Sequence, residues 1–438
     1  AVAGYLVLLL TLRKVTGNKT HSAYLATILV LIGSTTLIHG QQSYVHAWVF
    51  KNVIDYNLTA LSESKAYSQS FIEKLKFEEP YSCAPKSAKN PNVIVLMVES
   101  LSSYQSDFFS GVHDWTPHLD NIARQNTAYQ QFYANGFTTE DGEISLLTGR
   151  LPIPKPASLS AGGGTSFAGF FDLPDTLPKI LKARDYQTNF LTTADLSFSN
   201  TGAWLASIGF DYIEGHEHPY YDQWPRYHFS AAPDEALLQR INAVVEQDMA
   251  AGKRSFTFAK TVSTHHPFVD PQSNIKSEEA AFRYADRQIG QFYEGLKASG
   301  YFEHGLLIIV GDHHAMVPLK EPEIQRFGVQ RAGSRVPLII ADGSEVARNI
   351  NDLYQQTDVY NGLKYLGREQ SCQSPWLGNV FGYGAWTAQY IAHRRGDNRD
   401  IISVFSGQHN VRIKLDGDKT KVVGQNALSD KINQRLVD

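Results

Sequence analysis

The sequence predicts an α/β fold with a mainly parallel central sheet and helices on both faces. Two observations predict this class: continuous apolar runs that end in polar residues, and amphipathic segments that alternate with those runs. A continuous apolar run is typical of a strand buried on both faces, and strands alternating with helices are typical of a parallel sheet. The predicted strands are 92–99, 186–195, 255–263, 305–312 and 336–342, and the predicted helices are 116–126, 173–185, 233–252 and 277–300.

This main α/β domain is predicted to span residues 91–370, with different patterns on either side of it. Residues 43–90 show mixed helical periodicity and predict a helical linker that leads into the domain. After about residue 377 the chain has short segments typical of antiparallel strands, with an Asp-Gly turn at 416–417. We therefore predict a small antiparallel, β-rich subdomain over 371–438.

The N-terminus carries two uncharged apolar segments, 1–12 and 23–40, with a basic loop between them. A membrane-spanning helix needs about 20 mostly apolar residues, so these segments predict transmembrane helices over 1–42. The chain opens inside the first segment, so we expect that helix to be truncated. The positive-inside rule places the basic loop in the cytoplasm and the chain after Gly40 outside it. The alternative is two buried helices of a soluble domain.

Composition and cysteine count narrow the class of protein. The 438 residues include 12% aromatics and 19% charged residues, with a net charge of −4, which excludes disorder and offers no basic face for nucleic acid. The two cysteines, Cys83 and Cys372, are either free buried thiols or a single disulfide of an exported domain. A disulfide would favour an oxidising compartment such as the periplasm.

Polar groups at the predicted strand ends suggest a metal site. Glu99 ends the first strand, and Asp312 and His313 follow the run 305–311. Functional groups gather at the carboxyl ends of parallel strands, and two carboxylates with an imidazole suit a hard or borderline divalent ion. The alternatives are a helix N-cap or an arginine ion pair for Glu99, and a surface turn for the Gly-Asp-His-His segment.

A second polar cluster precedes the predicted buried helix of the run "TTEDGEISLL". Thr138 and Thr139 lie at its start, where amide donors favour a phosphate. A metal can activate a threonine hydroxyl as a nucleophile, so one interpretation is phosphoryl transfer. The other is a capping box, in which Thr139 caps the helix and Gly142 or Glu143 falls near its third position.

Five segments occur in an order that resembles a known superfamily: "NVIVLMVES", "TPHLDNIA", "NGFTTEDGEISLLTGRLP", "TVSTHHPF" and "IIVGDHHA". The chain resembles the alkaline phosphatase/sulfatase superfamily over roughly residues 90–370. Within it, the chain is most similar to the membrane-anchored phosphoglycerol transferase branch. That branch includes the lipoteichoic acid synthases and the periplasmic glucan phosphoglycerol transferases.

The resemblance implies which threonine is the nucleophile. In sulfatases the modified Cys or Ser lies eleven residues before the Arg of "LLTGR", and counting back from Arg150 gives Thr139. The segment "TEDGE" also matches the transferase branch with Thr139 first. A formylglycine sulfatase needs Cys or Ser there, followed by Pro and Arg, so the resemblance argues against sulfate-ester hydrolysis by that route.

The resemblance further implies that Glu99, Thr139, Asp312 and His313 hold one divalent metal ion. Manganese is the expected ion, with magnesium and zinc as alternatives. Each of these residues occupies the matching position of a family motif.

Three more residues match substrate positions of the family. His265 matches the histidine that contacts the substrate phosphate and protonates the leaving group, with His266 as the competing choice. Asp195 matches a position that binds the headgroup. The segment that follows, "DLSFSNTGAW", departs from the Phe-Trp-Asn-Arg type run of the lipoteichoic acid synthases, because it has no Arg and carries Trp204 later.

The function implied by the resemblance is two-step phosphoglycerol transfer. Thr139 would attack a phosphatidylglycerol-like membrane phospholipid, and an extracytoplasmic glycan or polyol-phosphate acceptor would take the group from the phosphothreonine. The enzyme would be embedded in the bacterial inner membrane, with its catalytic domain facing the periplasm or cell exterior. The alternatives are phosphoethanolamine transfer or phosphodiester hydrolysis at the same site, and a catalytically silent lipid-binding sensor.

Overall fold

A computed structural model of the chain describes residues 82–85, 90–153, 167, 169–374, 377–396, 401–407, 409–416 and 419–423. The predicted membrane helices lie outside these residues, as does most of the predicted linker. Within the described ranges, no helix combines the length and the apolar character needed to span a bilayer.

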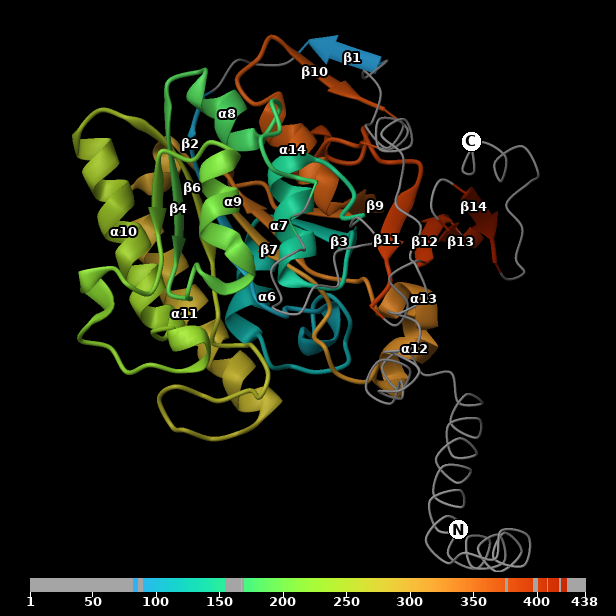
Figure 1. Cartoon of the computed structure of the whole chain (residues 1–438), viewed down its shortest axis with the longest axis horizontal. Coiled ribbons are helices and arrows are strands. Elements are labelled where there is room, and N and C mark those ends of the chain that lie inside the picture. Colours follow the sequence, from blue (N-terminus) through green and yellow to red (C-terminus); the bar gives the residue numbers. More distant parts are fainter. Residues whose placement is uncertain are drawn as a thin grey trace, which may run out of the picture. The chain divides into compact units, whose positions relative to one another are not determined.

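The centre of the described chain is an eight-stranded sheet with the order β5-β4-β6-β2-β7-β8-β3-β9 (Figure 1). Strand β8 runs antiparallel to both of its neighbours, and the other neighbouring pairs are parallel. The predicted mainly parallel sheet is therefore confirmed. Its strands are β2 (Asn92–Val98), β3 (Thr127–Tyr133), β4 (Tyr186–Thr192), β5 (Tyr212–Glu214), β6 (Arg254–Lys260), β7 (Gly305–Gly311), β8 (Leu338–Ala341) and β9 (Arg348–Gln355).

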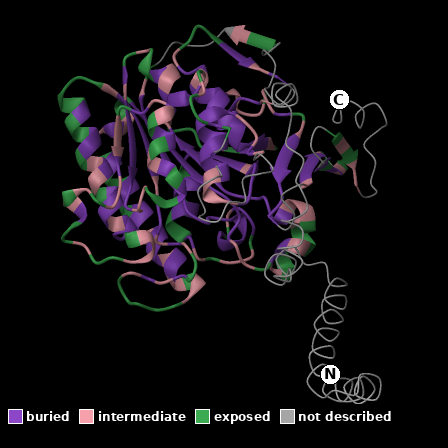
Figure 2. Ribbon diagram, in the orientation of Figure 1, coloured by how far each residue is buried: buried purple, intermediate pink, exposed green. Residues whose placement is uncertain are grey.

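Helices cover both faces of this sheet, as predicted. Alternate residues of β2 enter two different apolar clusters, because successive side chains of a strand point to opposite faces. Figure 2 shows the central strands buried along most of their length. One cluster contains residues of α7 (Thr139–Thr148), α8 (Leu177–Lys182), α9 (Thr201–Ser207) and α14 (Gln356–Lys364), and the other contains residues of α6 (Pro117–Gln125), α10 (Asp234–Ala250) and α11 (Glu278–Ala298).

Short helices complete the connections between these elements. Among the described residues, six are single 3-10 turns and two are brief α-helices that precede β8. They are η1 (Ser103–Gln105), η3 (Phe198–Asn200), η4 (Pro219–Tyr221), η5 (His228–Ser230), η6 (Tyr301–Glu303), η7 (Val380–Gly382), α12 (Glu321–Phe327) and α13 (Val329–Ala332).

Strands β3, β5 and β9 were not predicted from the sequence. Strand β9 lies at the edge of the sheet and mixes exposed with buried positions, so it has no continuous apolar run. Strand β3 carries two glutamines in its centre, and β5 is only three residues long. These strands are held by pairing with their neighbours, which a search for apolar runs does not detect.

A separate small sheet lies in the last third of the chain. Strands β11 (Ile391–Arg394), β12 (Ile401–Ser406), β13 (His409–Asp416) and β14 (Lys419–Val422) form an antiparallel sheet, which confirms the predicted β-rich character of this region. The predicted turn at 416–417 includes Gly417, which lies outside the described residues.

The two cysteines are bonded to each other. Strand β1 (Ser82–Pro85) pairs antiparallel with β10 (Gln370–Gln373), and Cys83 lies opposite Cys372 in the register. Their sulfurs form a disulfide across 289 residues of sequence. The disulfide alternative is thus the one that the structure adopts, and it joins the start of the described chain to the region after α14.

Candidate active site

Glu99 follows the last residue of β2 and is held in place from three sides. Its backbone N–H donates to the Thr261 hydroxyl at 2.9 Å, and its carbonyl accepts from the Thr264 hydroxyl at 2.5 Å. Ser100, whose φ of 57° lies in the left-handed region, donates its hydroxyl to Glu99 Oε1 at 2.8 Å. Glu99 is 4% exposed. A strained residue at the end of a central strand is typical of a functional site.

The Glu99 carboxylate faces an imidazole and a hydroxyl rather than capping a helix. Its Oε1 lies 3.6 Å from His313 Nε2, and its Oε2 accepts from the Thr139 hydroxyl at 3.0 Å. Burial alone would raise its pKa, but His313, His265 and Ser100 outweigh burial and hold the pKa of Glu99 below its usual value. The N-cap and arginine-pair alternatives for Glu99 are therefore wrong.

Asp312 follows the last residue of β7, next to the register pair Val98–Gly311 that precedes Glu99 and Asp312, and it is fully buried. Its Oδ1 accepts from the backbone N–H groups of Ser100 and His313, both at 2.7 Å. Its Oδ2 is buried without a hydrogen-bond partner among the described residues. Burial, together with the neighbouring Glu99, raises the pKa of Asp312 well above its usual value. Such a carboxylate is costly to bury unless a cation completes its surroundings.

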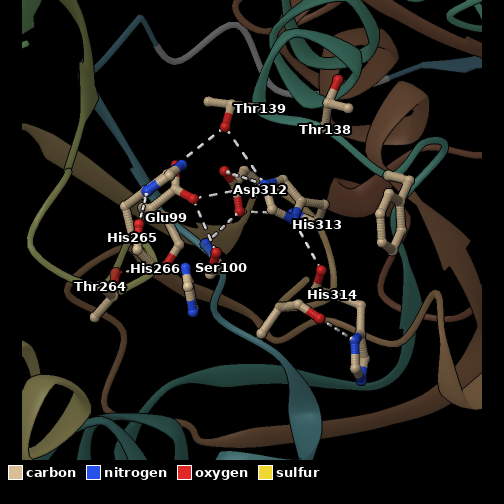
Figure 3. A network of polar contacts seen from close by, with 12 residues as sticks. Glu99, Ser100, Thr138, Thr139, Thr264, His265, His266, Asp312, His313 and His314 are labelled. Atoms are coloured by element: carbon tan, nitrogen blue, oxygen red, sulfur yellow. Dashed lines mark hydrogen bonds and ion pairs between the residues drawn. The ribbon is translucent and has the colours of Figure 1, made fainter. Parts of the chain in front are cut away.

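His313 is oriented as a metal ligand would be. Its Nδ1 donates to the carbonyl oxygen of His314 at 2.8 Å, because a carbonyl can only accept, and this leaves Nε2 unprotonated in the neutral ring. Burial lowers the pKa of His313, which favours the neutral form. Figure 3 shows Nε2 directed at the two carboxylates. The surface-turn alternative for this segment is therefore wrong.

Glu99, Asp312 and His313 together fit a divalent metal ion. One potential ligand atom of each lies within 4.8 Å of the others, and all three residues are buried. The unpartnered Oδ2 of Asp312 is the atom that a cation would satisfy. Oxygen and nitrogen donors of this kind suit manganese, magnesium or zinc.

The two adjacent threonines have different surroundings, one at the helix cap and the other facing the candidate metal ligands. Thr138 is the N-cap of α7: its hydroxyl accepts from the N–H of Asp141 at 3.3 Å. Thr139 is the first residue of the helix, and its hydroxyl lies 3.0 Å from Glu99 Oε2 and 3.4 Å from His313 Nε2. The prediction that Thr139 caps the helix is wrong, because the capping box begins one residue earlier.

The acidic residues Glu140 and Asp141 contact groups other than the candidate metal ligands. Asp141 Oδ2 accepts from the backbone N–H of Phe137 at 2.9 Å, and its Oδ1 pairs with Arg394 of β11 at 2.7 Å. Glu140 accepts from the Ser199 hydroxyl at 3.0 Å. Because Arg394 comes from the C-terminal sheet, this buried ion pair ties that sheet to α7, the helix that presents Thr139.

Gly142 explains why the helix lies so close to Asp312. A Cβ at this position would be 2.8 Å from the carbonyl oxygen of Asp312, closer than real Cβ contacts allow. Any larger residue would push the first turn of α7 away from the end of β7. The small residue in "TEDGE" thus keeps Thr139 within reach of the carboxylates.

A pocket of about 170 Å³ opens beside Thr139. Glu99, Asp195 and His265 line it together with Thr139, and Phe198 forms part of its apolar wall. Phe198 is 50% exposed. The pocket therefore brings together a hydroxyl, carboxylates and an imidazole beside an accessible apolar surface.

Residues 91–364 match the family model of the sulfatases. The chain belongs to the sulfatase family. Its relatives include phosphoglycerol transferase I of Citrobacter koseri, 26% identical over 275 residues, and that of Escherichia coli, 26% identical over 273 residues. Each alignment covers 57% of this chain and 34% of the relative, so the chain spans about a third of the length of these relatives.

Solved structures share the sulfatase fold of this chain. A protein in the alkaline phosphatase superfamily from Vibrio parahaemolyticus matches with a TM-score of 0.61 and 20% identity, over 84% of this chain and 91% of that one. The lipoteichoic acid synthase LtaP from Listeria monocytogenes matches with a TM-score of 0.60 and 20% identity, over 81% and 92%. The superfamily predicted from the motifs is confirmed.

The structure separates the two candidate histidines of this sulfatase-family chain. His265 lines the pocket, with its Nδ1 2.5 Å from the carbonyl oxygen of His266 and its ring packed edge-on against Phe229. His265 Nε2 is then the ring nitrogen that can exchange a proton with a ligand. His266 is exposed, packs on Phe268, and is not a lining residue of the pocket.

Asp195 also lines the pocket, three residues beyond the end of β4. Its Oδ1 accepts from the N–H of Ser197 at 2.8 Å and lies 3.8 Å from His216 Nδ1. The hydrogen bond from Ser197, and then His216, lower the pKa of Asp195. Trp204, in contrast, is fully buried and stacks on Phe167, so it belongs to the core and not to the pocket.

Sequence analysis missed Lys260 and its partner Glu143. Lys260 ends β6 and lines the pocket, and its Nζ lies 2.8 Å from Glu143 Oε1 on α7. The signal was present, because Lys260 is a charged residue between the buried strand "SFTFA" and the His265 motif. The partner could not be inferred, since it comes from a different element.

Proposed function

We propose that the protein is a metal-dependent phosphoglycerol transferase that works through a phosphothreonine intermediate. The observation that carries the proposal is the placement of the Thr139 hydroxyl against Glu99 and His313 at the mouth of a pocket. A threonine alcohol is a weak nucleophile unless its alkoxide is stabilised. The curated relatives named phosphoglycerol transferase I support this reaction class.

We propose that Glu99, Asp312, His313 and the Thr139 oxygen hold one divalent metal ion, with manganese expected and magnesium or zinc as alternatives. The orphaned Oδ2 of Asp312 and the orientation of His313 support this ligand set. A divalent ion held there would supply Lewis-acid stabilisation of the threonine oxygen and of the phosphoryl group.

The proposed first step forms one bond and breaks one. Thr139 enters this step as its alkoxide, after its hydroxyl proton has been released to solvent. Its oxygen attacks the phosphorus of a phosphatidylglycerol-like lipid, and the bond from phosphorus to the diacylglycerol oxygen breaks. His265 donates a proton to that oxygen, so diacylglycerol leaves as a neutral alcohol. In the second step an acceptor hydroxyl attacks the phosphorus, the bond to Thr139 breaks, and His265 takes up the acceptor proton. The phosphoglycerol group has then moved from lipid to acceptor.

The substrates and the compartment are part of this proposal. Asp195 lines the pocket and can accept a hydrogen bond from a glycerol hydroxyl. The acceptor would be a glycan or a polyol phosphate outside the cytoplasm, and the enzyme would be embedded in a bacterial inner membrane. The disulfide between Cys83 and Cys372 supports an oxidising compartment such as the periplasm.

Three other functions are alternatives: two reactions at the same site, and lipid binding without catalysis. Phosphoethanolamine transfer or phosphodiester hydrolysis would need the same nucleophile and metal ligands. A silent lipid-binding sensor would not need Thr139, the two carboxylates and His313 in mutual contact, and their convergence argues against it.

The donor assay distinguishes the headgroups. With Mn²⁺ and vesicles that contain labelled phosphatidylglycerol, we expect release of diacylglycerol that stops with EDTA and returns with added Mn²⁺. Vesicles with phosphatidylethanolamine serve as the matched donor control. Release from phosphatidylethanolamine alone would make the protein a phosphoethanolamine transferase. Release of the headgroup only as free glycerol phosphate, even with a glycan acceptor present, would make it a hydrolase.

His265→Gln should slow the transfer by about 10²-fold or more, because the leaving oxygen would lose its proton donor. His266→Gln is the matched control, since its exposed ring is not a lining residue of the pocket. The rate of diacylglycerol release is the measurement. Equal losses in the two variants would remove His265 from its proposed role.

A further inference from the structure

Lys260 is the one lysine or arginine among the described residues that line the pocket beside Thr139. It is the last residue of β6, and its side chain is 12% exposed. The same pocket is lined by the carboxylates of Glu99, Glu140 and Asp195. The fixed charges of the lining residues are thus mostly negative, which opposes the entry of an anionic phosphodiester.

The position of Lys260 is set by a buried ion pair. Its Nζ lies 2.8 Å from Oε1 of Glu143, whose side chain is completely buried. Glu143 lies four residues after Thr139 on α7, which is about one helical turn. The pair therefore connects the end of β6 to the helix that presents Thr139, and it fixes the ammonium group of a residue that lines the pocket.

The ammonium group stays charged in this environment. Burial alone would lower its pKa, but Glu143, Glu140 and Glu99 outweigh burial and hold the pKa of Lys260 above its usual value. An ammonium group has three N–H donors, and a single carboxylate oxygen at 2.8 Å uses one of them. Nζ also lies 5.8 Å from the centroid of the Phe190 ring, a cation–π contact that leaves at least one N–H donor for a ligand.

The segment after Asp195 offers no alternative to Lys260 as a positive charge. Residues 195–204 contain neither arginine nor lysine, so they cannot supply a positive charge to a bound phosphate. Lys260 reaches the pocket from the end of β6 and lines it together with Thr139 and His265.

We propose that Lys260 binds a nonbridging oxygen of the phosphoryl group beside Thr139, and that Glu143 is the positioning residue that holds it there. This proposal rests on the proposed function for the class of ligand, a phosphate ester of glycerol. It adds to that function a specific cation that compensates the acidic lining of the pocket.

The test compares the full chain with Lys260→Met/Glu143→Gln, a double variant that removes both charges of the ion pair. The control is Lys253→Met, because Lys253 is exposed just before the opposite end of β6. The probe is glycerol 1-phosphate in the presence of Mn²⁺, titrated by calorimetry, with the melting temperature measured for each protein. The double variant avoids the misfolding expected of Lys260→Met, which would leave the Glu143 charge buried without its partner.

We expect the double variant to melt close to the parent but to bind glycerol 1-phosphate at least about tenfold more weakly. Lys253→Met should match the parent in both measurements. If the double variant binds the probe as tightly as the parent, Lys260 has only a structural role and the proposal is overturned.

The proposal for Lys260 and the proposed transfer reaction can each fail independently of the other. If the parent releases no diacylglycerol but Lys260-dependent binding of glycerol 1-phosphate is seen, transfer is refuted and the phosphate-binding role of Lys260 stands. If the parent releases diacylglycerol and the double variant does so at the parent rate with parent binding, transfer stands and the role of Lys260 is refuted.

Discussion

Thr139→Ala should lower diacylglycerol release by about 10⁴-fold or more, because it removes the nucleophile of a reaction in which the catalytic groups act as a unit. The hydroxyl of Thr139 is the one that contacts Glu99 and His313. The helix should survive the change, since the cap of α7 is supplied by Thr138 and Asp141. Initial rates with phosphatidylglycerol vesicles and Mn²⁺ measure the effect.

Thr138→Ala is the matched control for this change. It should cost about 1 kcal/mol of unfolding free energy through the lost N-cap and retain most of the transfer activity. We thus expect Thr139→Ala to lose activity with little loss of stability, and Thr138→Ala to lose stability with little loss of activity. A large loss of activity in Thr138→Ala with little loss in Thr139→Ala would reverse the assignment.

Asp312→Asn should stabilise the metal-free protein and abolish its response to manganese. Burial and Glu99 raise the pKa of Asp312 well above its usual value, so the ionised carboxylate opposes folding at neutral pH when no cation is bound. An asparagine keeps the oxygen that accepts from Ser100 and His313, and its amide can donate to His313 Nε2, 3.3 Å from the present Oδ2. The like-charge repulsion with Glu99 is then gone.

The manganese response is measured by thermal unfolding at increasing Mn²⁺ concentrations. The parent should gain about 2.7 kcal/mol when the free ion reaches 100 times its dissociation constant. Asp312→Asn should start from a higher melting temperature and change little as Mn²⁺ is added. Asp352→Asn, at an exposed position of β9, is the control and should behave as the parent. Equal manganese responses in all three proteins would rule out Asp312 as a ligand.

Much of the fold follows from local pattern. The apolar runs before Glu99 and Asp312 are buried strands because each must fill both faces of a sheet, and they are found where expected. The edge strand β9 and the glutamine-containing β3 have no such pattern, because their stability comes from pairing with neighbours. The predicted membrane helices lie outside the described residues and remain a prediction.

The sequence predicted those residues of the candidate site that directly follow a strand. Glu99, Asp312 and His313 meet because neighbouring parallel strands β2 and β7 end at the same edge of the sheet. The exact start of α7 was not predictable, because Thr138 and Thr139 are equally good caps by residue type. In the structure the N–H of Asp141 donates to the Thr138 hydroxyl, so Thr138 is the cap.

Contacts between elements that are far apart in the sequence could not be predicted from the sequence. The ion pair of Lys260 with Glu143 joins β6 to α7, and that of Arg394 with Asp141 joins β11 to the same helix. Each charged residue alone is compatible with a solvated surface, and only the packing of the helix on the sheet brings the partners together.

The covalent intermediate is the central claim, and the mass of the protein tests it most directly. The full chain would be incubated with phosphatidylglycerol and Mn²⁺ without an acceptor, quenched, and weighed intact and after proteolysis. The account predicts an added glycerophosphoryl group on the peptide that contains Thr139, absent from Thr139→Ala. Diacylglycerol release without any adduct on this peptide, or an adduct on another residue, would contradict it.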